Sequence, residues 1–512
     1  MHKIKRQIKI MKKEKQNPLL WLAPIIFLII GAGLIPLNLF VFSMPEWITV
    51  LFAAFILAAL VIMWLKLKRK LHIKIIISVF SLLGIAVTLF GSLCNPYWNS
   101  IMFKSDDSLY YCRDYDSELT YSQAKADLDY AFKYLKKLHP FFYKSTPEEI
   151  QKRYDSVVSE LKGADKITVN RLAEQIQSIF SLLGDAHTSL FLNYTDPRYM
   201  KYIGTHKKAG DILIGINGNS LESLLDTDSP CHNKVSYEVK SWGIIQLKNY
   251  MNTLEGLNYL GIPTDKGITY NYQSKNGEKT DVYVTESDFL TYDEYVKFNG
   301  ISDTQDDTQE ESFVSYSIDR DKSTAVLTLT ECNYNKEYID TLNAMFKEIK
   351  AQGIKNIAVD LRDNGGGNSL VANEFFRYLD IDSFKEGSLN WRLGCFMIES
   401  PKIVTENKRY EELLFKGKLY LLTSNNSFSS AMLFAQFVKD NGLGTIIGEA
   451  PGNDPNGCGD ISVFRLPNSG ATIQISTKEF KRIDGKVGLI EPDIPCEKDN
   501  ALDCFFKECE EQ

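Results

Sequence analysis

The hydrophobic positions of this chain follow two patterns, which change near residue 95. Before that point, uninterrupted hydrophobic runs cover 19–42, 47–65 and 75–94. As a helix, each run is long enough to cross the roughly 30 Å of a bilayer's hydrocarbon core. No charged residue lies inside a run, which argues against an ion or proton path. The pattern predicts three transmembrane helices within 17–95, and it is too long for a cleavable signal peptide.

After a polar linker at 96–118, the hydrophobic spacing becomes that of a globular protein. Hydrophobic residues three and four apart predict helices in a subdomain at 119–200. Short runs between Gly, Asn and Asp turns predict a small β-rich insert at 201–312. From 313 to 512, runs typical of buried strands alternate with helical stripes, which predicts an α/β core.

Charge divides the chain near the same place. Residues 1–104 hold 13 Lys and Arg against two Glu, whereas the rest holds 45 Lys and Arg against 63 Asp and Glu. An acidic body argues against nucleic acid as a partner. The basic residues gather in the tail at 1–16 and between the second and third runs, and such segments stay in the cytoplasm. We therefore expect a multi-pass protein of the cell membrane, with lipid around three spans and the body outside the cytoplasm.

The nine cysteines do not indicate a metal site. Eight of them follow the hydrophobic runs, where an oxidising compartment permits disulfides, but their spacing names no pairs. None forms a Cys-x-x-Cys motif, and His232 beside Cys231 lacks the second ligand pair of a zinc site. We expect no metal and no other cofactor.

Three short segments carry residue types that are used in catalysis. The first places His187 between a predicted helix and a predicted strand. The second follows a strand with three glycines, 365–367, and such a turn aims backbone N–H groups at a phosphate or at a developing oxyanion. The Walker Lys-Ser/Thr of a phosphate loop is missing. The third places serines 427, 429 and 430 between a strand and a helix. Taken singly, each segment also fits a structural role: a buried histidine, a turn and a helix cap.

Together these segments resemble the C-terminal processing, or tail-specific, serine peptidases and their relatives with a tricorn-type core. The matching strings, in chain order, are Leu183-Gly-Asp-Ala-His-Thr188, Asp360-Leu-Arg-Asp-Asn-Gly-Gly-Gly367, Asn426-Ser-Phe-Ser-Ser-Ala431, Lys439-Asp-Asn-Gly442 with Ile446-Ile-Gly-Glu449, and Glu491-Pro-Asp-Ile494. The resemblance covers about residues 120–500. It implies a ClpP/crotonase-like α/β core, a helical N-terminal subdomain and an inserted PDZ-like module. Asp211–Gly218 resembles the strand and turn of such a module.

The resemblance also implies roles for particular residues. The family's reactive serine lies thirteen residues before the glycine of an Asp-x-Gly, and Ser429 lies thirteen residues before Gly442. Ser429 is therefore the expected nucleophile. The backbone N–H of Ser430, with that of Gly365 or Gly366, is expected to form the oxyanion hole.

The general base is expected to be a histidine. The tail-specific branch uses a lysine after the serine, but no lysine lies between Lys439 and Lys478. His187 stands where the tricorn-like branch carries its base, and an imidazole is suited to accept the serine proton near neutral pH. The sequence thus resembles the histidine-base branch rather than the Ser-Lys branch.

The acid that orients the imidazole is left open. Glu491 and Asp484 are the candidates, whereas Asp185 and Asp360 are expected to cap turns or to pair with Arg362. The expected function is a membrane-anchored extracytoplasmic serine endopeptidase that hydrolyses peptide bonds in a protein or peptide substrate. The alternative is a catalytically inactive module of the same fold that binds a peptide or an apolar ligand. The sequence predicts no oligomeric state.

Overall fold

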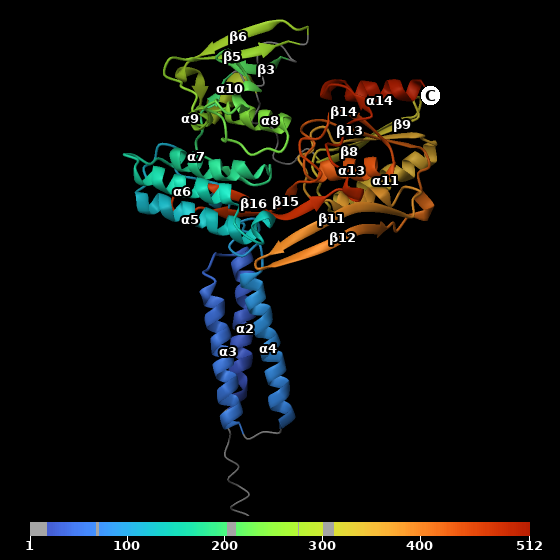
Figure 1. Cartoon of the computed structure of the whole chain (residues 1–512). Helices are drawn as coiled ribbons and strands as arrows, with labels where there is room; N and C mark the ends of the chain where they lie inside the picture. Colours follow the sequence, from blue (N-terminus) through green and yellow to red (C-terminus); the bar gives the residue numbers. More distant parts are fainter. Residues whose placement is uncertain (1–17, 68–70, 202–210, 275, 301–311, 512) are drawn as a thin grey trace, which may run out of the picture. The chain divides into compact units, whose positions relative to one another are not determined.

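A computed structural model of the chain divides into two compact units (Figure 1). The residues that it describes are 18–67, 71–201, 211–274, 276–300 and 312–511. The predicted cytoplasmic tail at 1–16 and three basic residues of the second loop, 68–70, lie outside them. The first unit runs to Tyr110 and includes Leu393–Phe396 and Ser462–Arg465. The second unit holds the remaining residues.

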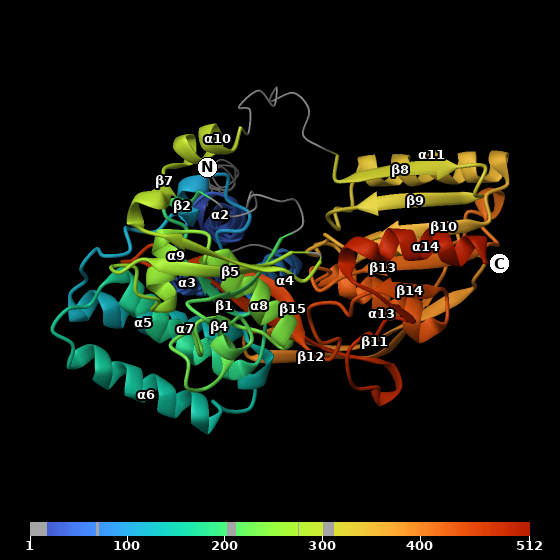
Figure 2. The ribbon, with the colours of Figure 1, turned by 90° about the horizontal axis from the view of Figure 1, so that it is seen from above.

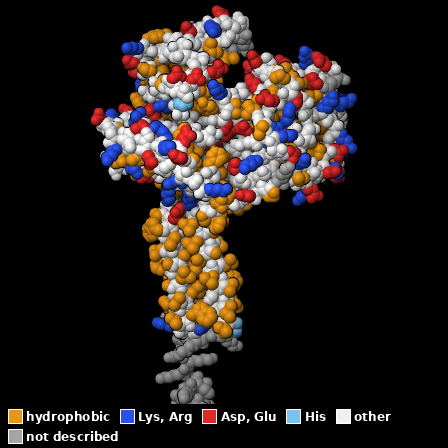
Figure 3. Space-filling model, viewed as in Figure 1, with side chains coloured by type: hydrophobic (Ala, Val, Ile, Leu, Met, Phe, Trp, Pro, Cys, Tyr) orange, Lys and Arg blue, Asp and Glu red, His pale blue; other side chains and the backbone are white. Residues whose placement is uncertain are grey.

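Three hydrophobic helices form most of the first unit. They are α2 (Leu19–Phe40), α3 (Trp47–Lys66) and α4 (Leu71–Leu93). Each is long and apolar enough to cross a membrane. Hydrophobic side chains cover their outer surface (Figure 3), and Leu65 and Phe80 are among those exposed. A continuous hydrophobic surface of this size is typical of a membrane contact. The three predicted hydrophobic helices are confirmed.

Buried polar side chains join these helices to the segment that follows α4. The hydroxyl groups of Thr49 and Ser92 lie 2.7 Å apart. Asn38 donates to the side-chain oxygen of Asn99, whose backbone N–H donates to Asn38 at 2.8 Å. Lys104 Nζ donates to the backbone oxygen of Asn38 at 3.0 Å. These bonds satisfy polar groups that burial would otherwise make costly.

The second unit is built around a six-stranded sheet in the order β17-β14-β13-β10-β9-β8. Its strands are β8 (Val314–Asp319), β9 (Thr324–Leu329), β10 (Asn356–Asp360), β13 (Lys418–Thr423), β14 (Thr445–Gly448) and β17 (Ile494–Pro495). Only β8 runs antiparallel to its neighbour within this sheet. The nearly unbroken hydrophobic sequences of β10 and β13 suit strands that are covered on both faces.

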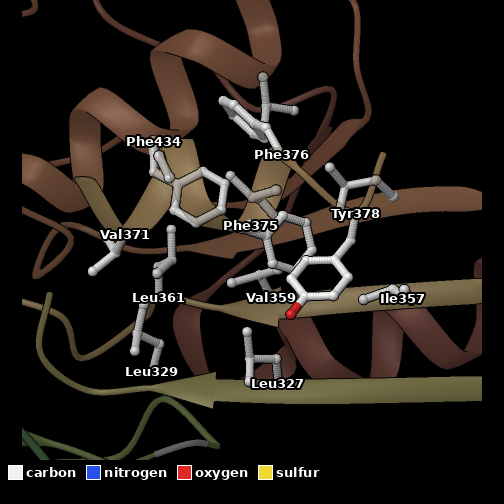
Figure 4. Close-up of a cluster of buried hydrophobic side chains, with 14 of the residues drawn as sticks. Leu327, Leu329, Ile357, Val359, Leu361, Val371, Phe375, Phe376, Tyr378 and Phe434 are labelled. Carbon is white, nitrogen blue, oxygen red and sulfur yellow. The ribbon is translucent and has the colours of Figure 1, made fainter. Parts of the chain in front are cut away.

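Helices cover both faces of this sheet. One face packs against α11 (Lys336–Gln352), α12 (Leu370–Phe376) and α13 (Ser430–Asn441). In Figure 4, Leu327 and Val359 of the strands meet Phe375 of α12 in this buried cluster. The other face packs against α14 (Ala501–Glu510), where the rings of Tyr420 and Phe505 lie 5.2 Å apart. The predicted α/β core is confirmed.

The helical subdomain contains the three predicted helices and pairs with a second sheet. The helices are α5 (Tyr121–Leu138), α6 (Glu148–Lys162) and α7 (Val169–Phe180). After α7, β1 (Ser189–Phe191) pairs antiparallel with β16 (Thr472–Lys481). The same sheet contains β11 (Ser383–Leu393), β12 (Phe396–Glu406) and β15 (Cys458–Arg465). This pairing brings the chain around residue 187 next to the C-terminal third.

The insert is less rich in strands than its sequence predicts. A four-stranded sheet has the order β4-β3-β5-β6, and β2 pairs with β7 (Figure 2). The strands are β2 (Tyr199–Met200), β3 (Ile212–Ile216), β4 (Asn219–Ser220), β5 (Ile268–Gln273), β6 (Lys279–Val284) and β7 (Phe289–Leu290). The described part of this segment also holds three α-helices, α8 (Lys240–Tyr250), α9 (Leu254–Leu260) and α10 (Tyr292–Asn299). The sequence of α8 has almost no helical periodicity, so the hydrophobic pattern could not predict it. The PDZ likeness stays a prediction.

Candidate active site

Ser429 lies on a sharp turn between strand β13 and helix α13. Its φ of 54° and ψ of −116° are strained for a residue with a side chain. The turn is held by Ser427, whose hydroxyl accepts from Ser424 N–H at 2.9 Å and donates to Leu361 O at 2.7 Å. Ser429 is half-buried, and its hydroxyl makes no hydrogen bond to the described residues. A serine on such a strand-to-helix turn presents its oxygen outward, as nucleophilic serines do.

The glycine loop after β10 lies directly against this turn. Gly366 has a φ of 102°, and a Cβ on it would lie 2.7 Å from Ser429 Cβ and 2.8 Å from Phe428 O. Only a glycine allows this approach. Asn364 fixes the loop, because its side chain accepts from Gly366 N–H at 2.8 Å and donates to Leu329 O at 2.9 Å.

Two backbone N–H groups near Ser429 are left for a ligand. Within the described residues, the N–H groups of Ser430 and Gly365 donate to no acceptor. The N–H of Gly366 is already used by Asn364. The Ser430 nitrogen lies only 3.0 Å from the position of a Cβ on Gly366. Of the two expected pairs, this arrangement favours Ser430 with Gly365 over Ser430 with Gly366.

His187 lies against the same turn from the side of the helical subdomain. Its ring centroid is 4.6 Å from that of Phe428, the neighbour of Ser429. The histidine is 7% exposed, and neither ring nitrogen has a hydrogen-bond partner in the described part of the chain. Burial lowers the pKa of His187, against the raising effect of the carboxylates of Asp185 and Asp460. Burial thus favours the neutral form of the ring, which is the form that accepts a proton.

Neither candidate acid is hydrogen-bonded to the imidazole. Glu491 is exposed, and Asp484 is an exposed turn residue whose carboxylate lies 3.9 Å from Lys385 Nζ. Asp185 is closer, with Oδ1 3.9 Å from His187 Nδ1. Asp185 was expected to be structural, and it does cap the turn, since it accepts from the backbone N–H of His187 at 2.9 Å. Its position beside the ring could not be predicted from its place in the motif.

Asp185 is held ionised by a second buried histidine. His139 Nε2 lies 3.1 Å from Asp185, and His139 Nδ1 accepts from Phe141 N–H at 3.3 Å. Burial alone would raise the pKa of Asp185, but the hydrogen bond from His139, the charges of His139 and His187 and the Thr188 hydroxyl together hold it well below its usual range. The sequence carried no signal for His139.

The insert contributes two residues that the sequence did not point to. Glu238 accepts from Asp454 N–H at 2.7 Å, and burial, followed by the negative charge of Asp185, raises its pKa to about 8. Trp242 of α8 stacks on Phe428, with centroids 3.9 Å apart and planes 13° apart. Neither residue belongs to a recognisable motif, because only the folded chain brings the insert to this turn.

A loop of the core that contains Asn453 occupies the part of the sequence where the tail-specific branch carries its lysine. Asn453 is 3% exposed, and its side-chain oxygen accepts the backbone N–H of Ser429 at 2.7 Å. The adjacent Gly452 N–H donates to Ser427 O at 2.9 Å. This loop therefore holds the strained backbone of Ser429. As expected, Asp360 pairs with Arg362, 2.7 Å away.

Comparison with known families identifies the core of the second unit. Residues 323–496 match the model of peptidase family S41. This stretch is about a third of the chain. The match runs from the start of β9 to β17 and includes the glycine loop and Ser429, but not His187. The predicted resemblance to this peptidase family and the predicted serine-type peptidase class are confirmed.

Solved structures that share the fold of this chain include two of CPAF. Mature CPAF complexed with lactacystin has a TM-score of 0.52 at 11% identity, over 76% of this chain and 97% of that one. Mature CPAF has a TM-score of 0.50 at 12% identity, over 76% and 95%. At such identities the likeness shows a shared fold. None of the curated protein sequences compared with the chain matches it.

Proposed function

We propose that this protein is a membrane-anchored serine endopeptidase in which Ser429 is the nucleophile and His187 is the general base. One observation carries the proposal: the strained Ser429 turn lies against the buried imidazole of His187 through Phe428. A nucleophile beside a general base is the minimum requirement for acyl transfer.

The reaction follows from these positions. Ser429 Oγ attacks the carbonyl carbon of the scissile peptide bond, and His187 accepts the hydroxyl proton. The N–H groups of Ser430 and Gly365 stabilise the negative oxygen of the tetrahedral intermediate. His187 then returns the proton to the leaving amine, and an acyl-enzyme on Ser429 remains. A water molecule, deprotonated by the same imidazole, hydrolyses this ester.

Asp185 is the residue that we propose to orient the imidazole. Its Oδ1 lies on the Nδ1 side of the ring at 3.9 Å, and its position is fixed by the bond from His139. A small rotation of the His187 ring would turn this approach into a hydrogen bond. Such bonds are often long in a peptidase without substrate and shorten when the substrate binds.

We propose that the peptidase domain lies outside the cytoplasm. Lys66 at the end of α3 and Lys74 near the start of α4 place positive charge at the turn between these helices. Positively charged turns stay on the cytoplasmic side. Three spans then deliver the chain after α4 to the outer face, where it meets protein or peptide substrates.

The proposal is tested by hydrolysis of an unfolded protein by the full chain in detergent. New peptide termini are expected by mass spectrometry with the wild type and are expected to be absent with Ser429→Ala. Ser159→Ala, on an exposed face of α6, is the matched control and is expected to cleave like the wild type. Equal cleavage by wild type and Ser429→Ala would overturn the proposal.

A second candidate function is a peptide- or apolar-ligand-binding module without turnover. It is favoured by the absence of a hydrogen bond on either ring nitrogen of His187 within the described residues. This module predicts that peptides bind to the wild type and to Ser429→Ala with the same affinity and are recovered uncut from both.

A further inference from the structure

Three potential metal ligands converge beside the Ser429 turn. Asp185, His187 and Glu238 each offer one ligand atom, and these atoms lie within 4.8 Å of one another. Asp185 and His187 come from the segment after α7, whereas Glu238 comes from the segment before α8 of the insert. Their convergence is a property of the fold, since about fifty residues separate them in the sequence.

Several atoms of this cluster are buried without a partner. Both ring nitrogens of His187, a residue 7% exposed, and Oε1 of Glu238 make no well-formed hydrogen bond to the described residues, although the backbone of Cys458 faces the imidazole and that of Ala186 faces the carboxyl group. Buried polar atoms are normally paired, so each unpaired atom requires an explanation. No described Lys or Arg forms an ion pair with Asp185 or Glu238. The cluster thus combines two carboxyl groups and an imidazole with no lysine or arginine paired to them.

Two neighbouring residues add further potential metal ligands. Asp185 belongs to a second group with His139 and Cys458, whose ligand atoms also lie within 4.8 Å of one another. Imidazole nitrogen, carboxylate oxygen and thiolate sulfur are the ligands that Zn²⁺ takes in proteins. Mg²⁺ and Ca²⁺ prefer sites made of oxygen alone.

We propose that Asp185, His187 and Glu238 form a Zn²⁺ site whose occupancy switches off the peptidase. The switching part rests on the proposed role of His187 as the base. Three protein ligands leave a fourth position for water. A neutral imidazole has one nitrogen with a free lone pair, and the other carries a proton. Zn²⁺ would take that lone pair, so the ring could not accept the proton of Ser429.

Inhibition of this kind is reversible, because no covalent bond of the chain changes. The wild-type protein would be active when Zn²⁺ is scarce and inactive when it is abundant. Glu238 would link the insert to the catalytic base, because it is the one residue of the three that comes from the insert. The insert would therefore decide how tightly the inhibitory ion binds.

Binding is tested without catalysis, in the full chain carrying Ser429→Ala. Co²⁺ is titrated as a coloured probe, and its four-coordinate visible absorption is expected to saturate at one ion per chain and to disappear when Zn²⁺ is added. Glu238→Gln is expected to weaken binding by about tenfold or more. Glu255→Gln is the matched control, because Glu255 is a buried glutamate of the same insert outside the cluster, and it is expected to bind like its parent. His187→Asn is a second ligand variant, and near-UV circular dichroism checks that each variant is folded.

The switch is tested by activity of the chain with Ser429 intact. Zn²⁺ is expected to stop hydrolysis and EDTA to restore it, and Glu238→Gln is expected to raise the inhibitory Zn²⁺ concentration by the same factor by which it weakens Co²⁺ binding. Absence of saturable Co²⁺ binding in the Ser429→Ala chain, or equal binding by folded Glu238→Gln, would overturn the metal site. Binding without inhibition of an active wild type would overturn the switch. Binding to a chain that never hydrolyses peptides would leave the metal site standing and contradict the proposed function.

Discussion

The two sides of the candidate active site use their polar groups differently. On the core side, Asn364, Ser427 and Asn453 each make hydrogen bonds that fix the glycine loop or the Ser429 turn. On the other side, His187 and Glu238 keep buried atoms without a partner in the described chain. Fixed N–H groups are what an oxyanion requires, because they need not reorganise during the reaction. A base, in contrast, must keep a lone pair available for a proton.

The largest loss of activity is expected when the base, His187, is removed. His187→Ala is expected to lower kcat/KM on the order of 10⁴-fold, since Ser429 loses its proton acceptor. The measurement is hydrolysis of a quenched fluorescent peptide. His232→Ala, a histidine of the insert whose Nδ1 lies 3.2 Å from Leu225 O, is the control and is expected to remain active. Near wild-type turnover by His187→Ala would mean that another residue is the base.

The next largest effect is expected on the core side, where Gly366 lies closest to the Ser429 turn. Gly366→Ala would place a methyl group 2.7 Å from Ser429 Cβ and 3.0 Å from Ser430 N, and its φ of 102° disfavours a side chain. We expect kcat to fall by about 10²-fold or more, because the oxyanion site and the nucleophile are displaced together. Gly163→Ala, at the end of α6, is the control, since its φ of −88° suits a side chain and its Cβ position lies 3.6 Å from the nearest atom, Ser159 O. Equal losses in the two variants would show that the close approach of Gly366 is unimportant.

A smaller loss of activity is expected when the hydrogen bond between Asn453 and the backbone N–H of Ser429 is removed. Asn453→Ala removes the acceptor of the Ser429 N–H bond, and leaving such a donor unpaired costs about 1–3 kcal/mol. We expect kcat to fall about tenfold, with little change in KM, because the strained turn is held less firmly. Steady-state kinetics separate the effect on kcat from the effect on KM. Asn426→Ala alters a half-buried amide near Ser429, which donates to Asp363 at 3.3 Å, and is expected to change neither constant.

The smallest effect concerns the contact between the insert and the turn. Trp242→Ala removes the stack on Phe428, and an aromatic pair is worth about 1 kcal/mol beyond its buried area. We expect a several-fold loss of kcat/KM, and Trp242→Phe is expected to restore most of it. Failure of the phenylalanine variant to recover activity would indicate that the indole N–H, and not the stacking, is needed.

The same two sides differ in how well the sequence predicts them. Ser429 and the glycine loop lie in short motifs of contiguous residues, so their proximity follows from adjacent parallel strands β10 and β13. His187 was also found by its motif. Glu238 and Trp242 had no such signal, because they reach the site from an insert whose helix α8 lacks amphipathic periodicity. The acid assignment was open for the same reason, since a carboxylate beside a ring depends on packing and not on spacing.

The same difference holds for the fold: elements with a strong hydrophobic pattern can be predicted, and elements without one cannot. The hydrophobic runs of the three N-terminal helices and the strand–helix alternation of the core are strong patterns, and both elements are present. The helices of the insert are short, and α8 mixes polar and apolar residues around its axis. Their packing against the rest of the second unit decides their structure, and a local pattern does not contain that information.

Covalent labelling by a serine-directed fluorophosphonate tests the central claim most directly. The probe is added to the full chain in detergent, and the mass of the intact protein and of its peptides is measured. The wild type is expected to gain one adduct, on the peptide that contains Ser429, and Ser429→Ala none. His187→Ala is expected to react much more slowly, because its serine has lost its base. An unlabelled wild type, under conditions that label a known serine peptidase, or an adduct that persists in Ser429→Ala, would contradict a Ser429-dependent peptidase.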